Sequence, residues 1–543
     1  MLSNRKIDCI IVGYNDINFD SFVATQKEME KYSGGYEEAK WNSLIWHGKR
    51  MKYMDVLNDV ITNATGKNPH LNVFEAPSAS VCYLKSYLQK KFEVEIVNFF
   101  NFEQEKFKKL LSQSPRSVAI TTTFYVENDP IAEIVKFVRK HNPNTKIIVG
   151  GPHILNLGSD YDEETQEYVF DTLGADIYVI DSQGEKTLSQ VLLQLQNGQD
   201  LSHVPNLFYR DNNGNFHRTQ RHVENNNLDE NSIDWSYFDS DFITPITYLR
   251  TARSCPFVCA FCNYPEMAGA HVLSSIDVVE RELKTLHEAG TRILAFVDDT
   301  FNFPKDRFKQ LLRMMISNQF NFRWFSFLRC SNVDEEVLDL MQESGCMGTL
   351  LGIESGDQTI LKSMKKASKV ERYQWAISEL HKRHIVTFAS MFCGFPGETE
   401  QSIMNTVKFL EEAAPTFYSM QLYYHDIRAP IQKRAEEFDI QGAGFSWKHR
   451  TMDWKEGVHW AKYMLRNISN SIPLSLYGMS AWGIAYLVSR GISIEQIKAF
   501  GKISKDLLLY SIDDNFSGDC SSQEQQLINL FRPTQATQSP LFK

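Results

Sequence analysis

The sequence predicts an α/β protein made of two successive series of alternating strands and helices, followed by a smaller helical segment. Short apolar runs separated by helical periodicity fill residues 1–205 and again 245–425. The alternation ends after residue 425, where tryptophans lie among helical patterns. Because strands that alternate with helices form parallel sheets, we expect a doubly wound, Rossmann-like domain over 1–205, a partial barrel over 245–425 and a small, mostly helical domain over 426–543.

The first series gives the elements of the Rossmann-like domain. Buried strands are predicted at 9–13, 93–99, 118–123, 146–151 and 176–180. Helices are predicted at 80–91, 104–112, 131–141 and 163–173. An aromatic-rich insertion at about 16–70 interrupts the series after its first strand. Residues 206–244 are interpreted as a hairpin around Asn212-Asn213-Gly214 and a polar linker.

Open parallel sheets bind ligands beyond the carboxyl ends of their strands. Three of those ends in this domain carry small polar residues and glycines, which allow a ligand to approach the backbone closely. The candidate binding residues are Thr121, Thr122, Thr123, Gly150, Gly151, Ser182, Gly184 and Glu185.

Six strand–helix units in the second series predict a partial (β/α)6 barrel. Its strands fall at 245–251, 292–297, 323–327, 349–353, 386–392 and 418–424. Helices lie between them, for example at 277–289 and 304–316. The tail at about 515–543 is polar, and no fixed structure is predicted for it.

The loop after the first barrel strand contains a C-x3-C-x2-C motif, formed by Cys255, Cys259 and Cys262, with Phe261 before the last cysteine. With nine cysteines in 543 residues, this spacing is improbable by chance. Three thiolates hold three irons of a [4Fe–4S] cluster and leave the fourth iron open to bind and reduce a small molecule. The motif therefore favours an enzyme that starts radical chemistry.

Two other uses of these cysteines are weaker alternatives. A structural zinc site needs four ligands, and recruiting His271 gives a C-x3-C-x2-C-x8-H spacing that is not typical of zinc fingers. A disulfide is disfavoured because no secretory segment is visible and the other six cysteines are scattered.

The later barrel strands also end in groups that can bind a ligand. Asp298 and Asp299 follow the second strand, Glu354 ends the fourth, and the turn Gly394-Phe-Pro-Gly397 follows the fifth. Carboxylates accept hydrogen bonds from an ammonium or from ribose hydroxyls, and a glycine turn lets the backbone approach an adenine edge. Each also has a purely structural alternative: Asp299 could cap a helix, Glu354 could pair with a lysine, and Gly394–Gly397 could be only a turn. Their shared rim favours a ligand site.

Composition argues against several classes of function. Hydrophobic residues make up 43% and charged residues 23%, as in ordinary globular proteins. A net charge of −10 without a long basic run argues against nucleic-acid binding. The longest weakly polar stretch, 474–488, is too short to span a membrane. Since no signal peptide is visible, we expect a reducing, cytoplasmic location.

Together, the cysteine motif, Gly352-Ile-Glu-Ser355 and Gly394-Phe-Pro-Gly-Glu398 resemble the radical S-adenosylmethionine (SAM) superfamily. Gly150-Gly151-Pro-His153, 174–180 and Gly184-Glu185 resemble its cobalamin-binding branch. More narrowly, the chain is similar to the family of the phosphinothricin-tripeptide P-methyltransferase, a class B methyltransferase type. This likeness covers nearly the whole chain and is carried by residues 13–17, 119–125, 296–302 and 451–454.

The resemblance implies three cofactors: a [4Fe–4S] cluster on the three cysteines, SAM at the barrel rim, and cobalamin on the eight candidate residues of the first domain. The implied SAM ligands are Asp298 or Asp299, Glu354, Phe261, Gly394, Pro396 and Gly397. The aspartates would meet the amino group, Glu354 the ribose, and Phe261 with the glycine turn the adenine.

The implied activity is methyl transfer from SAM via methylcobalamin. The acceptor would be an unactivated carbon, or a phosphinate phosphorus, of a natural-product or peptide intermediate. The resemblance also implies an electron donor such as flavodoxin or ferredoxin, with no nucleic-acid or membrane partner. No acid–base residue is required, so no catalytic residue is assigned, and the substrate stays open.

Three alternatives accompany this interpretation. None of the 14 histidines lies in an Asp-x-His-x-x-Gly segment, the source of a lower cobalt ligand in many cobalamin proteins. Either cobalt lacks that ligand, which eases its reduction, or the domain binds no cobalamin. The same cofactors also serve non-methylating cyclisations or rearrangements. A non-catalytic sensor is the least favoured alternative.

Overall fold

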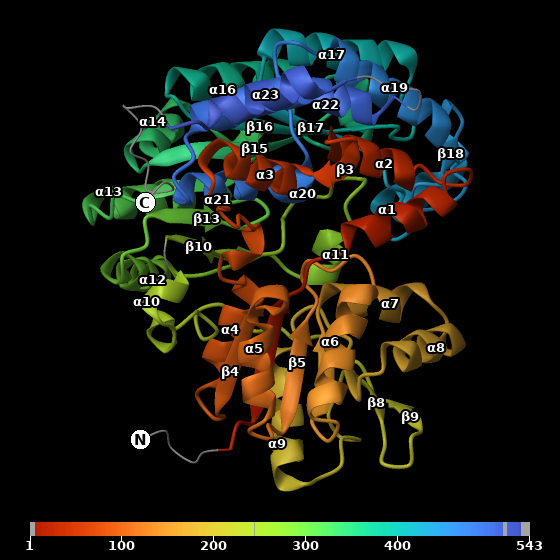
Figure 1. Cartoon of the computed structure of the whole chain (residues 1–543), viewed down its shortest axis with the longest axis vertical. Helices are drawn as coiled ribbons and strands as arrows, with labels where there is room; N and C mark the ends of the chain where they lie inside the picture. The colour runs from red at the N-terminus through yellow and green to blue at the C-terminus, as the bar shows by residue number, and fades with distance from the viewer. Residues whose placement is uncertain (1–5, 244, 514–518, 534–543) are drawn as a thin grey trace. The chain divides into compact units, whose positions relative to one another are not determined.

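The computed structural model describes residues 6–243, 245–513 and 519–533 of the chain (Figure 1). Its contacts separate two compact units. The first unit consists of the chain up to Asn18, Phe74–Ile243 and Met267–Leu286, and the second contains the remaining described residues. Among the described residues, no helix is long and apolar enough to cross a membrane.

The first unit contains a seven-stranded sheet whose first five strands in sheet order are parallel. The strands, in that order, are β4 (Val94–Phe99), β1 (Cys9–Tyr14), β5 (Ser117–Thr121), β6 (Lys146–Gly150), β7 (Ile177–Val179), β8 (Leu207–Arg210) and β9 (Phe216–Arg218). The helices are α4 (Ala79–Leu88), α5 (Phe100–Leu111), α6 (Asp129–His141), α7 (Pro152–Asp160), α8 (Glu163–Leu173) and α9 (Glu185–Asn197). The predicted α/β class is confirmed, and the strand order changes direction between β1 and β5.

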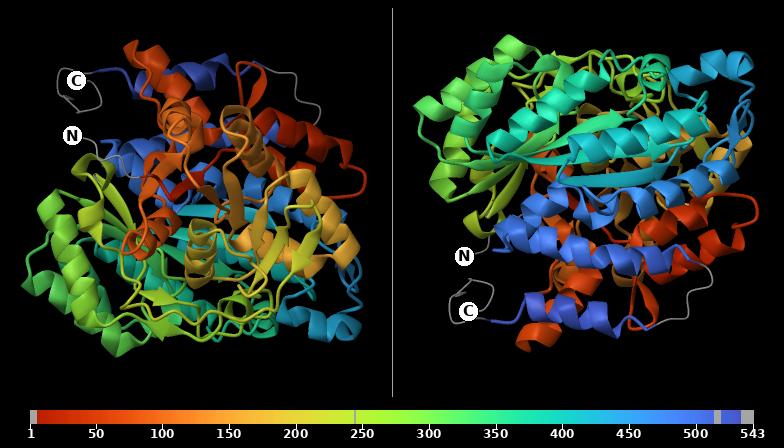
Figure 2. Two further views of the ribbon diagram at one scale, coloured as in Figure 1. Left: turned by 90° about the horizontal axis from the view of Figure 1, so that it is seen from below. Right: turned by 90° about the horizontal axis from the view of Figure 1, so that it is seen from above.

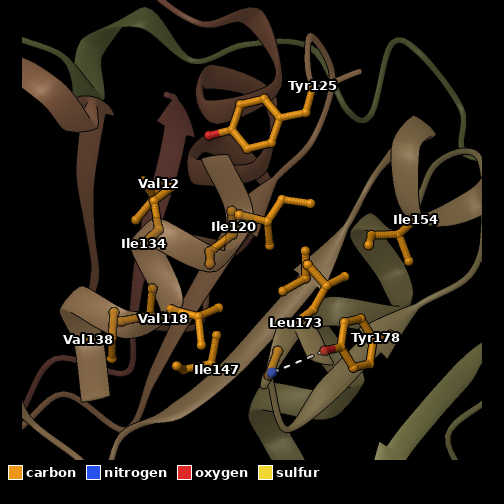
Figure 3. Close-up of a cluster of buried hydrophobic side chains, with 14 of the residues drawn as sticks. Val12, Val118, Ile120, Tyr125, Ile134, Val138, Ile147, Ile154, Leu173 and Tyr178 are labelled. Carbon is orange, nitrogen blue, oxygen red and sulfur yellow. Dashed lines mark hydrogen bonds between the residues drawn. The ribbon is translucent and has the colours of Figure 1, made fainter. Parts of the chain in front are cut away.

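Helices cover both faces of this sheet because side chains alternate along each strand. Ile10 and Val12 of β1 join one buried cluster, which includes side chains of α5, α6, α7 and α8. Cys9 and Ile11 join another, with α4 and α9. Figure 3 shows part of the first cluster, between the sheet and α6. Complete burial of each such aliphatic side chain contributes about 1.5–3 kcal/mol.

The predicted hairpin is present as β8 and β9, and it belongs to this sheet instead of lying outside the first domain. Strand β8 runs antiparallel to β7, with Phe208 opposite Tyr178, and β9 pairs with β8. Phe208 is buried in the same cluster as the parallel strands, so edge pairing and burial both extend the domain past residue 205. Helix α7 was not expected from the sequence. It begins at Pro152, whose fixed φ suits a first helical turn.

The second unit contains a seven-stranded, wholly parallel sheet, seen from above in Figure 2. In order, its strands are β10 (Ile246–Leu249), β13 (Ile293–Phe296), β14 (Arg323–Leu328), β15 (Cys346–Glu354), β16 (Val386–Cys393), β17 (Phe417–Leu422) and β20 (Ile472–Pro473). The connecting helices include α13 (Lys305–Ser317), α14 (Glu335–Glu343), α16 (Val370–Lys382) and α17 (Glu400–Ala413). All six predicted strands occur in the predicted order, and their linear arrangement gives an open, partial barrel.

The C-terminal helices pack on the second sheet instead of forming a separate domain. Helix α19 (Trp454–Asn467) contacts β16 and β17, α21 (Ala481–Ser489) contacts β13 and β14, and α22 (Ile494–Ser511) contacts β20. Trp482 of α21 meets Phe327 of β14 edge to face, with ring centroids 5.1 Å apart. These apolar contacts join the helices to the barrel.

Part of the predicted polar tail is ordered. Residues Ser521–Leu530 form α23, which buries Leu527, so the expectation of a tail without fixed structure is wrong for this segment. Residues 514–518 and 534–543 of the predicted tail lie outside the described residues.

The predicted insertion belongs to the second unit. It forms α1 (Phe19–Glu28), α2 (Gly35–Trp41), β2 (Ser43–Trp46), β3 (Lys49–Lys52) and α3 (Tyr53–Thr65). The buried Glu38 of α2 accepts a hydrogen bond from the Leu422 N–H, at the carboxyl end of β17, at 2.7 Å. Asn42 Nδ2 donates to the other carboxylate oxygen at 3.1 Å. Burial raises the pKa of Glu38 to about 8.

This carboxyl group makes the stability of the second unit depend on pH. Because the folded pKa lies above the ordinary 4.5, the contribution of Glu38 is complete below that value and is lost as pH rises toward about 8. Between about pH 5 and about pH 8, we expect the unfolding midpoint of the wild type to fall about 3 °C more than that of Glu38→Gln. Circular dichroism melts measure this, with the exposed Glu436→Gln as control. Equal pH slopes in all three proteins would contradict the role of Glu38.

Candidate functional site

The cysteine loop follows β10 and is fastened to the rest of the second unit by its backbone. The Ala260 N–H donates to the Met364 carbonyl at 2.8 Å, and the Ala260 carbonyl accepts from the Ile431 N–H at 2.7 Å. All three cysteines are free thiols; Cys259 is buried, whereas Cys255 and Cys262 are partly exposed. The loop thus presents three thiols from a fixed backbone.

A cation and a hydroxyl lie beside these thiols. The Arg329 guanidinium is 4.0 Å from Cys259 Sγ and lies over the Phe257 ring at 3.6 Å. Cys255 Sγ is 3.3 Å from Thr300 Oγ1. Burial and, to a lesser degree, the charges of the other two thiols raise the pKa of Cys262 to about 11. Three ionised thiols therefore need a bound cation to offset their charge.

The donor set fits a cluster better than a single ion. Within the described ranges, no three His, Cys, Asp or Glu side chains converge on a position for one metal ion. Three thiols on one loop match the ligand type of an iron–sulfur cluster, in which each thiolate takes a different iron.

Asp298 and Asp299 have different surroundings. The buried Asp298 accepts hydrogen bonds from the Thr251 N–H and hydroxyl, both at 2.6 Å, and from the Ala252 N–H at 3.0 Å. It therefore ties the end of β13 to the chain that enters the cysteine loop. Asp299 remains accessible to solvent next to Tyr264, and partial loss of water raises the pKa of Asp299 to about 6. Of the two, Asp299 is the one that can meet a ligand.

Glu354 is buried at the end of β15 in a left-handed backbone conformation, with φ +69°. Its Oε1 is 3.2 Å from Lys366 Nζ, so the lysine pair foreseen as the structural alternative is present. Ser390 Oγ lies 3.5 Å from Oε2. Burial raises the pKa of Glu354, and the Lys366 charge opposes that shift. Lys366 also lies over the Phe261 ring at 5.5 Å, which places the predicted aromatic near the same pair.

The glycine turn after β16 requires its glycines. Gly394 and Gly397 have φ values of +101° and +99°, where side chains are strained. The Gly394 and Phe395 N–H groups donate to the buried Glu398 carboxylate, at 2.6 and 3.1 Å. Burial raises the pKa of Glu398 to about 7. These amides are thus occupied from within the turn, as is the Phe395 carbonyl, which accepts from the Glu398 N–H at 2.9 Å.

Two residues behind this turn were missed from the sequence. His449 Nε2 lies 3.1 Å from the Gly394 carbonyl, and the His449 ring stacks on Trp447 with centroids 5.2 Å apart. Trp447 Nε1 donates to the Tyr423 carbonyl at 2.6 Å. Burial lowers the pKa of His449 to about 4, so the ring is neutral and its Nε2–H can donate. The only sequence signal was the nearby Thr451-Met-Asp-Trp454 segment.

Phe261 and the glycine turn are brought together by Phe392. The Phe261 and Phe392 rings meet edge to face with centroids 5.2 Å apart, and Phe392 lies 6.2 Å from Phe395 in the turn. The predicted aromatic and the predicted turn therefore belong to one continuous apolar wall.

In the first unit, the carboxyl ends of β5 and β6 are hydrogen-bonded to each other. The Thr122 N–H and hydroxyl both donate to the Gly150 carbonyl at 3.0 Å. A Cβ on Gly151, which has φ +111°, would lie 2.8 Å from Thr122 Oγ1. Thr121 Oγ1 is 3.3 Å from the Val12 carbonyl, whereas Thr123 is exposed. Thr121 and Thr122 thus shape the edge, and Thr123 can contact a ligand.

In the predicted binding loop after β7, several polar groups are already hydrogen-bonded to Glu224 and Asn226 of the same unit. The Glu224 carboxylate accepts from the Lys186 and Thr187 N–H groups at 2.9 and 2.6 Å, so the first-turn amides of α9 are occupied. Glu185 accepts from Asn226 Nδ2 at 2.9 Å. Gly184, with φ +88°, precedes the helix.

Three buried polar atoms at this carboxyl edge lack a hydrogen-bond partner in the described part of the chain. They are Asp181 Oδ2 and Ser182 Oγ after β7, and Asn15 Oδ1 after β1. Asp181 Oδ2 lies 4.0 Å from the Arg221 guanidinium. Buried polar atoms are normally paired, so Ser182 Oγ and Asn15 Oδ1 are available to a ligand. Asn15 was not singled out from the sequence as a binding residue.

Comparison with known proteins identifies the domain around the cysteine loop. Residues 249–410 match the family described as the radical SAM superfamily. The chain is 26% identical to an uncharacterized methyltransferase, PH0819, of Pyrococcus horikoshii, over 62% of this chain and 73% of that protein. It is 23% identical to the anaerobic magnesium-protoporphyrin IX monomethyl ester cyclase of Rubrivivax gelatinosus, over 68% of this chain and 69% of the cyclase.

Two solved structures have a similar fold. The radical SAM methyltransferase TsrM of Kitasatospora setae, with cobalamin and a [4Fe–4S] cluster bound, matches 67% of this chain and 75% of its own, with a TM-score of 0.54 and 19% identity. The cobalamin-dependent SAM radical enzyme OxsB, with aqua-cobalamin bound, matches 96% of this chain and 80% of its own, with a TM-score of 0.58 and 14% identity. The second match includes the sheets of both units.

Gly394→Ala tests the packing of the glycine turn. The new Cβ would lie 2.4 Å from the Trp447 ring. Gly48 also has a positive φ, +73°, but open space around it, so Gly48→Ala carries a similar backbone cost without a collision. We expect Gly394→Ala to lower the thermal unfolding midpoint at least about 4 °C more than Gly48→Ala. Equal shifts in differential scanning fluorimetry would show that Trp447 does not constrain the turn.

Proposed function

Because the chain carries a radical SAM domain and the fold of cobalamin-dependent radical SAM enzymes, as its motifs predicted, we propose that it is a cobalamin-dependent radical SAM methyltransferase. The supporting observation is the loop of Cys255, Cys259 and Cys262 at the carboxyl end of the first barrel strand, inside the matched domain. Active sites of barrel enzymes lie at this end of the strands.

The three cysteines would hold a [4Fe–4S] cluster, with Arg329 offsetting part of its negative charge. When bound, the cluster supplies the electron that splits SAM into methionine and a 5′-deoxyadenosyl radical, and cobalamin supplies the methyl group that is transferred. The protein's own contribution is to aim the substrate hydrogen and to exclude water and oxygen.

Each rim residue would contact a different part of SAM. Asp299 would meet the amino group, while Asp298 positions the cysteine loop from within. Glu354, held by Lys366, would accept from the ribose hydroxyls. Phe261 with Gly394, Pro396 and Gly397 of the glycine turn would line the adenine site. His449 and Glu398 act as positioning residues because they hold the turn from behind.

Cobalamin would bind at the carboxyl edge of the first sheet. Thr123, Gly151, Ser182 and Asn15 offer the accessible or unsatisfied groups there. The amides of Lys186 and Thr187 are already taken by Glu224, so they are not assigned to the nucleotide tail. Support for this cofactor comes from the fold shared with two cobalamin-bound enzymes.

The proposed methyl acceptor is a small-molecule or peptide intermediate of natural-product biosynthesis, methylated at an unactivated carbon or a phosphinate phosphorus. A reducing, cytoplasmic setting and an electron donor such as flavodoxin or ferredoxin complete the proposal. These points rest on the sequence resemblance alone.

A second candidate function is a non-methylating cyclisation with the same cofactors. It is favoured by the likeness to the magnesium-protoporphyrin IX monomethyl ester cyclase. The products separate the two reactions, because methyl transfer yields both S-adenosylhomocysteine and 5′-deoxyadenosine, whereas cyclisation yields only the latter. The deciding experiment is anaerobic reconstitution with iron, sulfide and hydroxocobalamin, followed by mass spectrometry of candidate substrates and of products from labelled SAM.

The triple variant Cys255→Ala/Cys259→Ala/Cys262→Ala tests the cluster. We expect the anaerobically reconstituted wild type to hold about four irons and four sulfides per chain, and the triple variant to hold neither. Reductive cleavage of SAM should disappear with them. Cys520→Ala, a buried thiol elsewhere in the second unit, should keep both properties. Zinc in place of iron in the wild type, or SAM cleavage by the triple variant, would refute the proposed function.

Gly151→Ala tests the cobalamin edge separately from the cluster. The added Cβ would collide with Thr122 and displace the end of β6. Gly198 also has a positive φ, +65°, with open space around it, so Gly198→Ala is the control in the same unit. We expect Gly151→Ala to weaken hydroxocobalamin binding about tenfold, with unchanged iron content. Cobalamin affinity is measured from the visible absorption of the bound cofactor. Equal affinity in both variants would show that this edge of the sheet does not bind cobalamin.

A further inference from the structure

A cavity of the second unit lies at the opposite end of the barrel from the cysteine loop. It has a volume of about 1040 Å³ and is lined by the residues that begin four strands: Arg323 of β14, Cys346 of β15, Val386 of β16 and Ile472 of β20. Helix α22 forms another wall with Lys498, Lys502 and Lys505. None of these residues belongs to the rim that carries the cysteines.

The lining is strongly cationic, although the whole chain has a formal charge of −10. It contains five cationic side chains, Arg323, Arg383, Lys498, Lys502 and Lys505, against a single carboxylate, Glu495. The three lysines are spaced by four and three residues, which puts them on one face of α22. A concave surface lined by one sign of charge concentrates its field in the cavity.

Three of the five cations have partners. Arg383 pairs with Asp339 and Glu379, and Lys498 pairs with Glu495 at 3.0 Å. Lys505 Nζ donates to the Ile468 carbonyl. Arg323 and Lys502 have neither a hydrogen bond nor an ion pair from their side chains within the described ranges. These two cations are therefore available to a ligand.

His381 in the same cavity responds to this positive field. Its Nε2 lies 2.9 Å from Thr387 Oγ1 and 3.3 Å from Thr416 Oγ1. Burial and the charge of Lys498 lower the pKa of His381, so the ring stays neutral and does not add to the cationic lining. The surplus charge therefore comes from arginine and lysine, which stay charged at neutral pH.

We propose that this cavity binds a small molecule that carries a diphosphate group. Its volume lies at the upper end of the range of small-molecule sites. The available guanidinium of Arg323 and ammonium group of Lys502, with two further lysines on the same helix face, suit a ligand with several negative charges on neighbouring oxygens. Met347, Ile385 and Ile472 add an apolar wall for a less polar part of the ligand.

Isothermal titration of the full-length holoenzyme tests this proposal, independently of the proposed methyl transfer. Sodium pyrophosphate and ADP are the two probes, in phosphate-free buffer at low, constant ionic strength, with saturating SAM present to block the adenine site. We expect one binding site per chain. Equal affinities would identify the diphosphate as the recognised group, and tighter binding of ADP would show that the apolar wall also contributes. Absence of binding by both probes would overturn the proposal.

A matched pair of double variants locates the site. Arg323→Gln/Lys502→Gln should weaken pyrophosphate binding at least about tenfold, because hydrogen bonds to charged groups are lost. Arg313→Gln/Lys408→Gln likewise removes one arginine and one lysine charge, but from exposed positions of α13 and α17 outside the cavity. It should leave the affinity for pyrophosphate within about twofold of the wild type. If the first double variant does not fold, the single variant Lys502→Gln replaces it, because Lys502 is an exposed position of α22. Unchanged binding by the folded cavity variants would contradict this location.

Discussion

The parallel pairing of the second sheet is the constraint on which the candidate site depends. Because its strands all run in one direction, their carboxyl ends share one rim, where the cysteine loop, both aspartates, Glu354 and the glycine turn come together. Asp298 strengthens this arrangement, since it binds the Thr251 and Ala252 N–H groups and so fixes the chain that enters the cysteine loop. The residues that would touch cofactors are thereby set by backbone geometry.

Buried carboxyl groups hold the rim in shape. Glu354 is paired with Lys366, Glu398 closes the glycine turn, and Glu38 reaches the end of β17 from a distant helix. Burying such groups is costly unless they are hydrogen-bonded or paired, and each of these three is. Satisfied polar groups of this kind fix a single arrangement, which radical chemistry needs to aim one hydrogen atom.

Local patterns in the sequence were sufficient to predict the cysteine motif and all strands of both sheets except β20, because apolar runs, helical periodicity and short spacings are read from neighbouring residues. Contacts between distant segments were not predictable in this way. Glu38 and Leu422 are 384 residues apart, and His449 reaches Gly394 only after the C-terminal segment folds back. The adjacent Asp298 and Asp299 look alike in sequence, and only their hydrogen bonds distinguish a positioning residue from an accessible one.

The most direct test of the account is electron paramagnetic resonance of the anaerobically reconstituted, dithionite-reduced protein, with and without SAM. If the three thiols leave one iron open, the reduced protein should show the signal of a [4Fe–4S]⁺ cluster, and SAM should change that signal by coordinating the open iron. A protein with no iron–sulfur signal, or with a signal that SAM leaves unaltered, would contradict the central claim.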